Sequence, residues 1–369
     1  MHVLPGLAVG GTEMVLLRLV GSTSGIKHRV VTLTVHDALR PEFEQLGVQV
    51  YTLGMSRNPF SWIRVFKLRK IIREFAPDIL QSWLYAADLA LMFSGVGRST
   101  RKIWNIRQSE TGLIRGQLHI YLMQRLAALL SRVVPDQIVY CGAVAKFLHQ
   151  GIGYGSTAAA VIPNGIDVAR YKPDVLARKS VREELGLGEG VFVFGMVGRY
   201  DPLKNQQLLL NAYALLAPQT EHVSLIMAGT NVDGDNPEIT AFINQTSPGN
   251  RVQLLGSRTD IPRVLAALDC HVLTSSSEGW PNVLAEAMAS ELYCITTPVG
   301  DAPNILDGCG KVLDGFESEE LAAAMINALE MTTDARKRFA RKARVRIESE
   351  FSMAKFSQRY QRLYEEQRL

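Results

Sequence analysis

The chain has little cysteine and no long apolar run, and these two absences narrow the class of protein. Its 369 residues include 4 cysteines, which stand far apart without a C-x-x-C pair. The sequence therefore predicts buried thiols rather than a disulfide framework or a zinc site. No apolar stretch approaches the ~20 residues of a membrane-spanning helix. The first residues also lack the basic and apolar regions of a signal peptide, so we expect a cytoplasmic protein.

The composition is that of a globular protein, but the charge is unevenly spread. With 47% hydrophobic and 21% charged residues, a chain of 369 residues predicts two domains. Residues 1–166 hold 18 Lys and Arg against 9 Asp and Glu, and the remainder holds 22 against 27, so +9 and −5 sum to the net +4. No nucleic-acid-binding signature accompanies the basic half. We expect it to face an anionic membrane surface or a phosphate-bearing acceptor, and not nucleic acid.

Strand-like segments alternate with helical ones in both halves, which predicts two α/β domains with doubly wound parallel sheets. A turn around Asn164 and Gly165, followed by a polar segment, marks the boundary. The predicted domains are 1–168 and 169–345. Residues 346–369 are predicted to form a helix that crosses back to the first domain.

In the first half, candidate ligand contacts lie where strands end. Ligands of open α/β sheets bind outside the carboxyl ends of strands, which makes Trp83 and Arg107 candidates for the acceptor or sugar side. Gly10 and Gly11 follow the first strand and would let the backbone approach a ligand closely. They do not form the G-x-G-x-x-G pattern of dinucleotide binding, and a plain strand-to-helix turn explains them equally well.

Residues 59–76 predict an amphipathic helix with Val65, Leu68, Ile72 and Phe75 on one face and a basic opposite side. Such a helix can lie on an anionic bilayer, or it can pack in the domain and leave its basic face in water. Residues 113–130 form another apolar and basic helical stretch.

In the second half, Arg199 and Lys204 follow a predicted central strand and precede a helix. Two cations and backbone amides there can share a diphosphate, although a basic pair in a loop is usually solvent-exposed charge. Asp233 and Asp235 have the form of a metal-binding acidic pair, but their Gly/Asn/Pro-rich setting predicts a surface turn. Asp260 is a plausible cap for the short helix that follows it.

Residues 270–289 read as a strand, a Ser/Gly/Pro loop and a helix, with Pro281 in the first helical turn. The helix start favours an anion, and Glu278 and Glu286 flank that place. Acids beside an anion site more plausibly accept hydroxyl groups of a sugar and a ribose. The spacing alone is equally compatible with a solvated loop acid and a surface helix acid.

Four motifs in this order resemble family four of the glycosyltransferases. They are Gly-Gly-Thr-Glu at 10–13, Val-Ile-Pro-Asn-Gly-Ile-Asp at 161–167, Gly-Arg-x4-Lys-Asn at 198–205, and Glu-x7-Glu at 278–286. The resemblance implies the GT-B fold, in which two Rossmann-like domains face each other across a cleft. It also implies transfer of a sugar from a nucleotide-sugar donor with retention of configuration, without a metal or other cofactor.

The same resemblance implies roles for individual residues. Arg199 and Lys204 would bind the donor diphosphate, Glu278 the sugar hydroxyls and Glu286 the ribose. The remaining implied donor-binding residues are Gly10, Gly11, Asn205, Gly279, Asn282, Val283 and Leu284.

Two segments depart from the family pattern. Many members carry a histidine where this chain reads Asn-Ile-Arg-Gln-Ser at 105–109, so a contact there would fall to Arg107 or its neighbours. After Pro298-Val-Gly300, many relatives continue with Gly and a Pro-Glu pair, but this chain has Asp301-Ala-Pro-Asn304. That loop would lie near the nucleotide.

The interpretation is a hexosyl- or N-acetylhexosaminyl-transferase, peripheral on the cytoplasmic face of the membrane. Its acceptor would be a lipid-linked or glycolipid saccharide in cell-surface polysaccharide or lipopolysaccharide biosynthesis. Two alternatives stay open: a soluble glycosyltransferase with a small sugar acceptor, and a non-catalytic nucleotide-sugar-binding protein.

Overall fold

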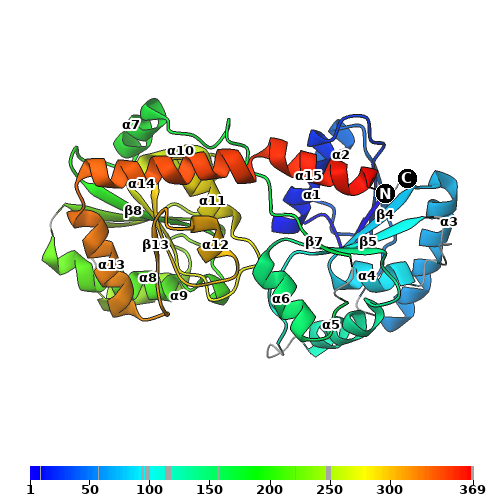
Figure 1. The fold of residues 1–369 in the computed structure, drawn as a ribbon. Helices are drawn as coiled ribbons and strands as arrows, with labels where there is room; N and C mark the ends of the chain where they lie inside the picture. The colour runs from blue at the N-terminus through cyan, green and yellow to red at the C-terminus, as the bar shows by residue number, and fades with distance from the viewer. Residues whose placement is uncertain are drawn as a thin grey trace. The chain divides into compact units, whose positions relative to one another are not determined.

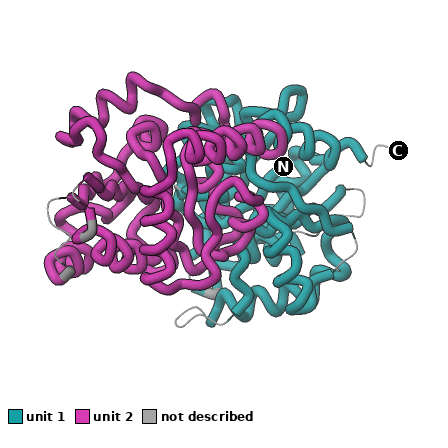
Figure 2. The backbone as a smooth tube through the Cα atoms, turned by 60° about the vertical axis from the view of Figure 1, so that its left-hand side comes forward, with its two compact units in different colours: residues 1–165, 353–369 teal, residues 166–352 magenta. Residues whose placement is uncertain are grey.

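A computed structural model describes residues 1–8, 10–56, 58–92, 95, 100–112, 118–155, 158–220, 222–246 and 251–366. The chain divides into two compact units (Figure 2). Unit 1 is Met1–Gly165 with Met353–Leu369, and unit 2 is Ile166–Ser352. The boundaries therefore differ from the predicted 168 and 346. Ile166 belongs to unit 2 because its N–H donates to the Phe351 carbonyl at 2.8 Å and it pairs with Ser352.

Unit 1 is built on a parallel sheet whose described strands run in the order β3-β2-β1-β4-β5-β6-β7. The strands are β1 (His2–Leu4), β2 (Arg29–Thr32), β3 (Gln49–Thr52), β4 (Ile79–Trp83), β5 (Arg101–Ile106), β6 (Gln137–Tyr140) and β7 (Ala159–Val161). The helices are α1 (Gly11–Ser22), α2 (Arg40–Gln45), the 3-10 turn η1 (Pro59–Arg64), α3 (Val65–Phe75), α4 (Tyr85–Met92), α5 (Leu118–Leu130), α6 (Ala143–Gly151) and α15 (Met353–Glu365). Helices cover both faces of the sheet (Figure 1).

Unit 2 repeats this plan with a parallel sheet in the order β10-β9-β8-β11-β12-β13 over its described residues. The strands are β8 (Phe192–Val197), β9 (Val223–Ala228), β10 (Val252–Leu254), β11 (Cys270–Leu273), β12 (Tyr293–Thr296) and β13 (Lys311–Val312). The helices are α7 (Val175–Glu184), η2 (Pro202–Lys204), α8 (Gln206–Leu216), η3 (Ala217–Gln219), α9 (Pro237–Thr246), α10 (Ile261–Ala267), α11 (Asn282–Ala289), α12 (Ala302–Leu306), α13 (Ser318–Glu330), α14 (Thr333–Arg346) and the π turn η5 (Ile347–Phe351).

The strand order defines one special place in each sheet. The first strand of each unit lies between its second and its fourth strand, so β1 and β4 are neighbours in unit 1, and β8 and β11 in unit 2. The order of strands reverses between these neighbours, which is where doubly wound sheets bind ligands. Two Rossmann-like α/β units are present, and the predicted fold class is confirmed.

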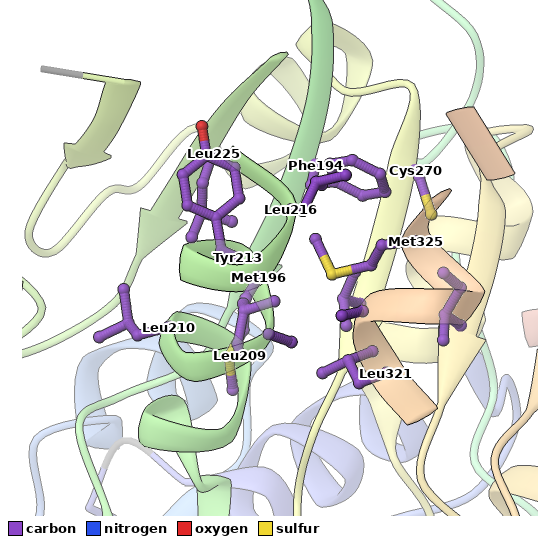
Figure 3. Packing of buried hydrophobic residues seen from close by; sticks show 14 of the residues in the cluster. Phe194, Met196, Leu209, Leu210, Tyr213, Leu216, Leu225, Cys270, Leu321 and Met325 are labelled. Carbon is purple, nitrogen blue, oxygen red and sulfur yellow. The ribbon is translucent and has the colours of Figure 1, made fainter. Parts of the chain in front are cut away.

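The core of unit 2 lies between its sheet and helices α8 and α13. Side chains of α8 (Leu209, Tyr213 and Leu216) and of α13 (Leu321 and Met325) gather against β8, as Figure 3 shows. β8 reads as a nearly continuous apolar run because both faces of a parallel sheet are covered. The strand is therefore a rigid base for the loop that follows it.

The core of unit 1 includes a helix from the far end of the sequence. Phe356, Tyr360 and Leu363 of α15 are buried in the same cluster as Leu16 and Leu19 of α1. The Tyr360 hydroxyl donates to Asn105 Oδ1 at 2.9 Å, and both residues are buried. The predicted return of the C-terminal helix to the first domain is confirmed.

Residues 59–76 form two elements instead of one helix, since η1 precedes α3. Val65, Leu68 and Ile72 are buried in unit 1, and the lysines and arginines of α3 point to solvent. This apolar face of α3 is thus already used for packing. Of the two predicted alternatives, the structure has the packed helix with its basic face in water.

Two expectations from composition concern membranes and thiols. Within the described residues, no helix has both the length and the apolar character to cross a membrane. All four cysteines are free and buried, as predicted. Residues 113–117 of the second predicted amphipathic stretch lie outside the described residues, and the rest of it is α5.

Candidate functional site

An ion pair lies at the carboxyl edge of the unit 2 sheet, between the loops that follow β8 and β11. Lys204 Nζ is 2.5 Å from Glu278 Oε1, and the Ser275 hydroxyl donates to the same oxygen at 2.7 Å. The side chains of Lys204 and Glu278 are 21% and 14% exposed. The pair is therefore largely shielded from solvent but still accessible to a ligand. It lies at the carboxyl ends of the neighbouring strands β8 and β11, where ligand binding is expected.

Hydrogen bonds join the two loops that carry this pair. The Thr274 hydroxyl is 3.0 Å from the carbonyl oxygens of both Lys204 and Asn205, and Ser276 N–H donates to the Leu203 carbonyl at 2.8 Å. Asn205 has a left-handed backbone with φ of 50°, which asparagine tolerates, and its side chain accepts from the Leu208 N–H to begin α8. Lys204 is consequently held between a strand end and a helix start.

A third loop, after β12, packs against the Glu278 backbone. Gly300 has φ of +48°, and a Cβ there would lie 2.1 Å from the Glu278 carbonyl oxygen. The Thr297 hydroxyl donates to the Ser275 carbonyl at 2.6 Å. Only glycine fits at 300, so this contact fixes the backbone position of Glu278.

Arg199 lies on the same loop as Lys204 but contacts a different acid. Its guanidinium is 2.7 Å from Asp201 Oδ2, and the Arg199 side chain is 64% exposed. Partial burial acts to raise the pKa of Asp201, but the Leu203 N–H and the Arg199 guanidinium outweigh it and lower that pKa. The sequence interpretation missed Asp201, although its place two residues after Arg199 was a visible signal.

Helix α11 begins one residue later than predicted. Pro281 is the residue before the helix instead of part of its first turn, and no side chain caps the helix. Gly279, Asn282 and Val283 are half-buried at this start, whereas Leu284 is fully buried. The first backbone N–H groups of a helix have no partner within it, so those of 282–284 are directed toward the loop.

Glu286 lies on the second turn of α11. It is 8% exposed, so the alternative of a solvated surface acid is wrong for this residue. Leu284, Ala287 and Met288 are buried on the same helix, which explains how the helix holds an acid in a shielded place. Its role toward a ribose stays a prediction.

Gly10 and Gly11 lie in unit 1, where they begin α1. Gly10 has an extended backbone, and a Cβ there would lie 2.5 Å from Glu13 Oε2. The Glu13 carboxylate therefore folds back to the helix start, and burial raises its pKa. The predicted approach of the two glycines to a donor stays a prediction.

Trp83 has different surroundings from those predicted, whereas the role of Arg107 stays a prediction. Trp83 is fully buried, and its indole N–H donates to His2 Nδ1 at 3.3 Å. Trp83 is thus a core residue, which corrects its placement on a ligand-binding edge. Arg107 is half-buried, with its guanidinium 5.7 Å from the Trp83 ring and bonded to the Asn164 side chain.

The acidic pair at 233 and 235 lies in a turn, as predicted. Asp233 Oδ1 accepts the Asp235 N–H at 3.2 Å, and Asp233 is half-buried and Asp235 exposed. Asp260 precedes α10, but no side-chain bond caps that helix. Instead Asp260 Oδ1 accepts from Arg258 at 2.8 Å, which corrects its predicted role. Among the described residues, no three His, Cys, Asp or Glu side chains gather in a way that could hold a metal ion.

Comparison with protein families agrees with this geometry. The model described as Glycosyl transferases group 1 matches residues 177–346, which include Lys204 and Glu278. The model described as Glycosyltransferase Family 4 matches residues 9–170. The chain belongs to the family four glycosyltransferases, and it is a glycosyltransferase of the GT-B fold.

Individual relatives match over different lengths. The putative glycosyltransferase EpsF of Bacillus subtilis is 28% identical over 80% of this chain and 78% of its own length. An Escherichia coli enzyme named UDP-Gal:alpha-D-GlcNAc-diphosphoundecaprenol alpha-1,3-galactosyltransferase is 33% identical, over 47% of this chain and 45% of its own. The crystal structure of Anabaena Alr3699/HepE in complex with UDP has a TM-score of 0.84 at 22% identity and covers 98% of both chains.

Proposed function

We propose that this chain is a retaining transferase that moves a hexosyl or N-acetylhexosaminyl group from a nucleotide sugar to a lipid-linked or glycolipid saccharide. The main support for a nucleotide-sugar donor site is the Lys204–Glu278 pair, 2.5 Å apart at the carboxyl edge of the sheet where β8 and β11 are neighbours. HepE, which has this fold, was crystallised with UDP and with UDP-glucose, and this supports a nucleoside diphosphate as the anion.

The chemistry of sugar transfer fits these residues. The leaving group is a nucleoside diphosphate, so the site must stabilise the negative charge that develops on it. Lys204, Arg199 and the N–H groups that begin α11 supply positive charge without a metal. A donor displaces Glu278 from Lys204, which frees a carboxylate to accept hydroxyl groups of the transferred sugar.

We infer the acceptor from the positive charge of residues 1–166 and from the reaction for which one relative is named. Residues 1–166 carry a net +9, which favours an acceptor with a phosphate or an anionic membrane around it. The Escherichia coli relative is named for transfer to a diphosphoundecaprenol-linked sugar. We therefore place the enzyme in cell-surface polysaccharide biosynthesis, peripheral on the cytoplasmic face of a membrane.

The test is a panel of nucleotide sugars assayed for donor hydrolysis and for transfer to lipid-linked saccharides. Lys204→Ala should reduce turnover by about 10²–10³-fold, the usual effect of removing one group that stabilises developing charge. Lys311→Ala, on β13, is a matched lysine control. Equal turnover of Lys204→Ala and wild type would remove Lys204 from the site.

Two further outcomes separate this proposal from its alternatives. A wild-type protein that binds nucleotide sugars but turns over none is a non-catalytic binding protein. Loss of activity in EDTA with recovery in manganese would contradict the metal-independent reaction, and transfer to free small sugars alone would favour the soluble alternative.

A further inference from the structure

The outer face of α5 carries a row of large apolar side chains in contact with solvent. Leu118, Leu122, Leu126, Leu129 and Val133, which follows the helix, are between 46% and 79% exposed. Their spacing of three or four residues places them along one side of the helix. Soluble proteins rarely expose a contiguous row of this kind without a partner. We call these five residues the α5 ridge.

The opposite side of α5 is fixed to unit 1, so the ridge is a stable surface. Gln124, Ala127 and Ala128 are buried, and Gln124 Nε2 donates to the Tyr85 hydroxyl of α4 at 2.9 Å. Figure 1 shows α5 at the rim of unit 1, beside α4. The helix is therefore held by one face and presents the other outward.

The charged side chains of α5 and of the three residues that follow it are all positive. Arg125 and Arg132 fall along one edge of the apolar row, and residues 118–133 contain no Asp or Glu. Both arginines are exposed and bond only weakly to backbone carbonyls, at 3.5 Å from Ile152 and 3.3 Å from Gly153. Neither has a carboxylate partner among the described residues, so both are available to an anionic partner.

We propose that the α5 ridge is the surface by which this protein docks on an anionic lipid bilayer. Apolar side chains enter the boundary between headgroups and acyl chains, while arginines at their edge stay with the phosphates. A second copy of the chain fits less well, because a twofold interface on this face would bring the same arginines together. The inference rests on the proposed lipid-linked acceptor and names the surface that reaches it.

The basic face of α3 is the alternative surface within unit 1. Val65, Leu68 and Ile72 of α3 are buried, whereas Phe66 of α3 and Phe60 and Ile63 of η1 are exposed. This face therefore offers three exposed apolar side chains against the five of the ridge, and one of its lysines, Lys70, is 3.8 Å from Glu74. The α5 ridge offers an apolar row, and Arg125 and Arg132 beside it have no carboxylate partner among the described residues. The ridge and these two arginines together meet both requirements of interfacial binding.

The experiment is co-sedimentation of the full chain with phosphatidylcholine vesicles, with and without phosphatidylglycerol. Leu122→Ser/Leu129→Ser should weaken binding to the anionic vesicles at least about tenfold, because two leucines that would enter the bilayer are lost. Leu176→Ser is the matched control, since Leu176 is an exposed leucine on α7 of unit 2. It should bind like wild type.

Charge variants test the arginines and the alternative helix. Arg125→Gln/Arg132→Gln should weaken binding about fivefold for each arginine and reduce its salt dependence. Lys67→Gln/Lys70→Gln on α3 should have a smaller effect. Greater loss in the α3 variant than in the ridge variant would overturn the proposal.

A tryptophan probe keeps the test informative if the serine variant unfolds. Leu122→Trp should show blue-shifted emission on anionic vesicles and quenching by brominated lipids, and no shift would overturn the proposal. Ridge variants that dissociate a dimer but still bind vesicles would instead identify a second copy as the partner. Nucleotide-sugar turnover without vesicles should be unchanged, so failed docking is distinguishable from a failed function.

Discussion

The two units have the same strand order but differ in what their strand ends carry. In unit 2 the loops after β8 and β11 meet in the Lys204–Glu278 pair. In unit 1 the loops after β1 and β4 lead into Gly11 and Tyr85, and no described ion pair joins them. The Tyr85 hydroxyl is buried and lies 2.6 Å from His149 Nε2. The strand order that the two units share defines where a ligand can bind, and the side chains of the loops determine which ligand and which reaction the site suits.

The units also differ in where their cores come from. The core cluster of unit 2 is drawn from residues 192–328, within one continuous stretch of chain. Unit 1 takes Phe356, Tyr360 and Leu363 from a segment that follows unit 2 in the sequence. Substitutions in α15 should therefore change the stability of unit 1 without changing the residues of the unit 2 site, and substitutions in that site should do the reverse.

The largest expected effect is on the stability of unit 1. Phe356→Ala should lower its free energy of unfolding by about 3–5 kcal/mol, because a fully buried ring is lost from the core. Hydrogen exchange should show lost protection in α1 but not in α8. Phe147→Ala, at an exposed phenylalanine of α6, is the control. Equal loss in both units would mean that α15 is not specific to unit 1.

The next effect concerns the chemistry of the unit 2 edge. Glu278→Gln should reduce turnover about hundredfold with only a few-fold change in donor affinity, because it misplaces Lys204 and the sugar. Initial rates and calorimetric donor binding measure the two quantities. Glu184→Gln is the control, since Glu184 also forms an ion pair, 2.7 Å from Arg258, away from the edge. A variant that loses donor affinity as much as turnover would contradict this role.

A pH experiment compares buried histidines in the two units. Burial lowers the pKa of His271 in β11 to about 4, and burial likewise lowers that of His149 in α6 to about 4. A histidine whose folded pKa is depressed stabilises the fold above its unfolded pKa of about 6.5, and this stability is lost as the pH falls toward 4.

Acidification from pH about 7.5 to about 5 should lower the free energy of unfolding of unit 2 by about 2 kcal/mol, because His271 binds a proton more readily in the unfolded chain. His271→Leu should remove this part of the pH dependence from unit 2 and leave that of unit 1, measured by denaturant unfolding with exchange readout. His222, which is exposed, provides the control site. An unchanged pH slope in His271→Leu would show that His271 does not titrate on unfolding.

The smallest expected effect is on positioning within the site. Ser275→Ala removes the 2.7 Å hydrogen bond to Glu278 and should lower kcat about tenfold, as for a bond to a charged group, with KM for the donor nearly unchanged. Ser275→Thr keeps the hydroxyl and should restore most of kcat. Ser276→Ala is the control, since that side chain is exposed. A change in KM alone would assign Ser275 to donor binding.

Much of the fold could be predicted because it is encoded locally. The apolar run at 192–197 matches β8, since buried parallel strands need apolar side chains on both faces. The motif at 278–286 lies where a strand, loop and helix were expected. Periodicity and turn residues are properties of neighbouring residues, so a sequence shows them directly.

The remaining features depend on residues far apart in the chain. The sequence does not show that Lys204 meets Glu278, that Arg199 pairs with Asp201 in preference to a distant acid, or that Trp83 is covered on all sides. The predicted amphipathic pattern is present in α3, but the sequence did not show that η1 precedes this helix or how the helix packs in unit 1.

The return of α15 has a consequence for synthesis of the chain. Unit 2 ends at Ser352, so its whole sequence leaves the ribosome before the residues that complete unit 1. Domains fold as units during synthesis, and an incomplete core exposes apolar surface. The sequence of unit 1 is the first to be synthesised and the last to be completed. Leu16 and Leu19 of α1 therefore lack their packing partners Phe356 and Tyr360 until synthesis is nearly finished, and we expect the nascent first unit to need protection from aggregation.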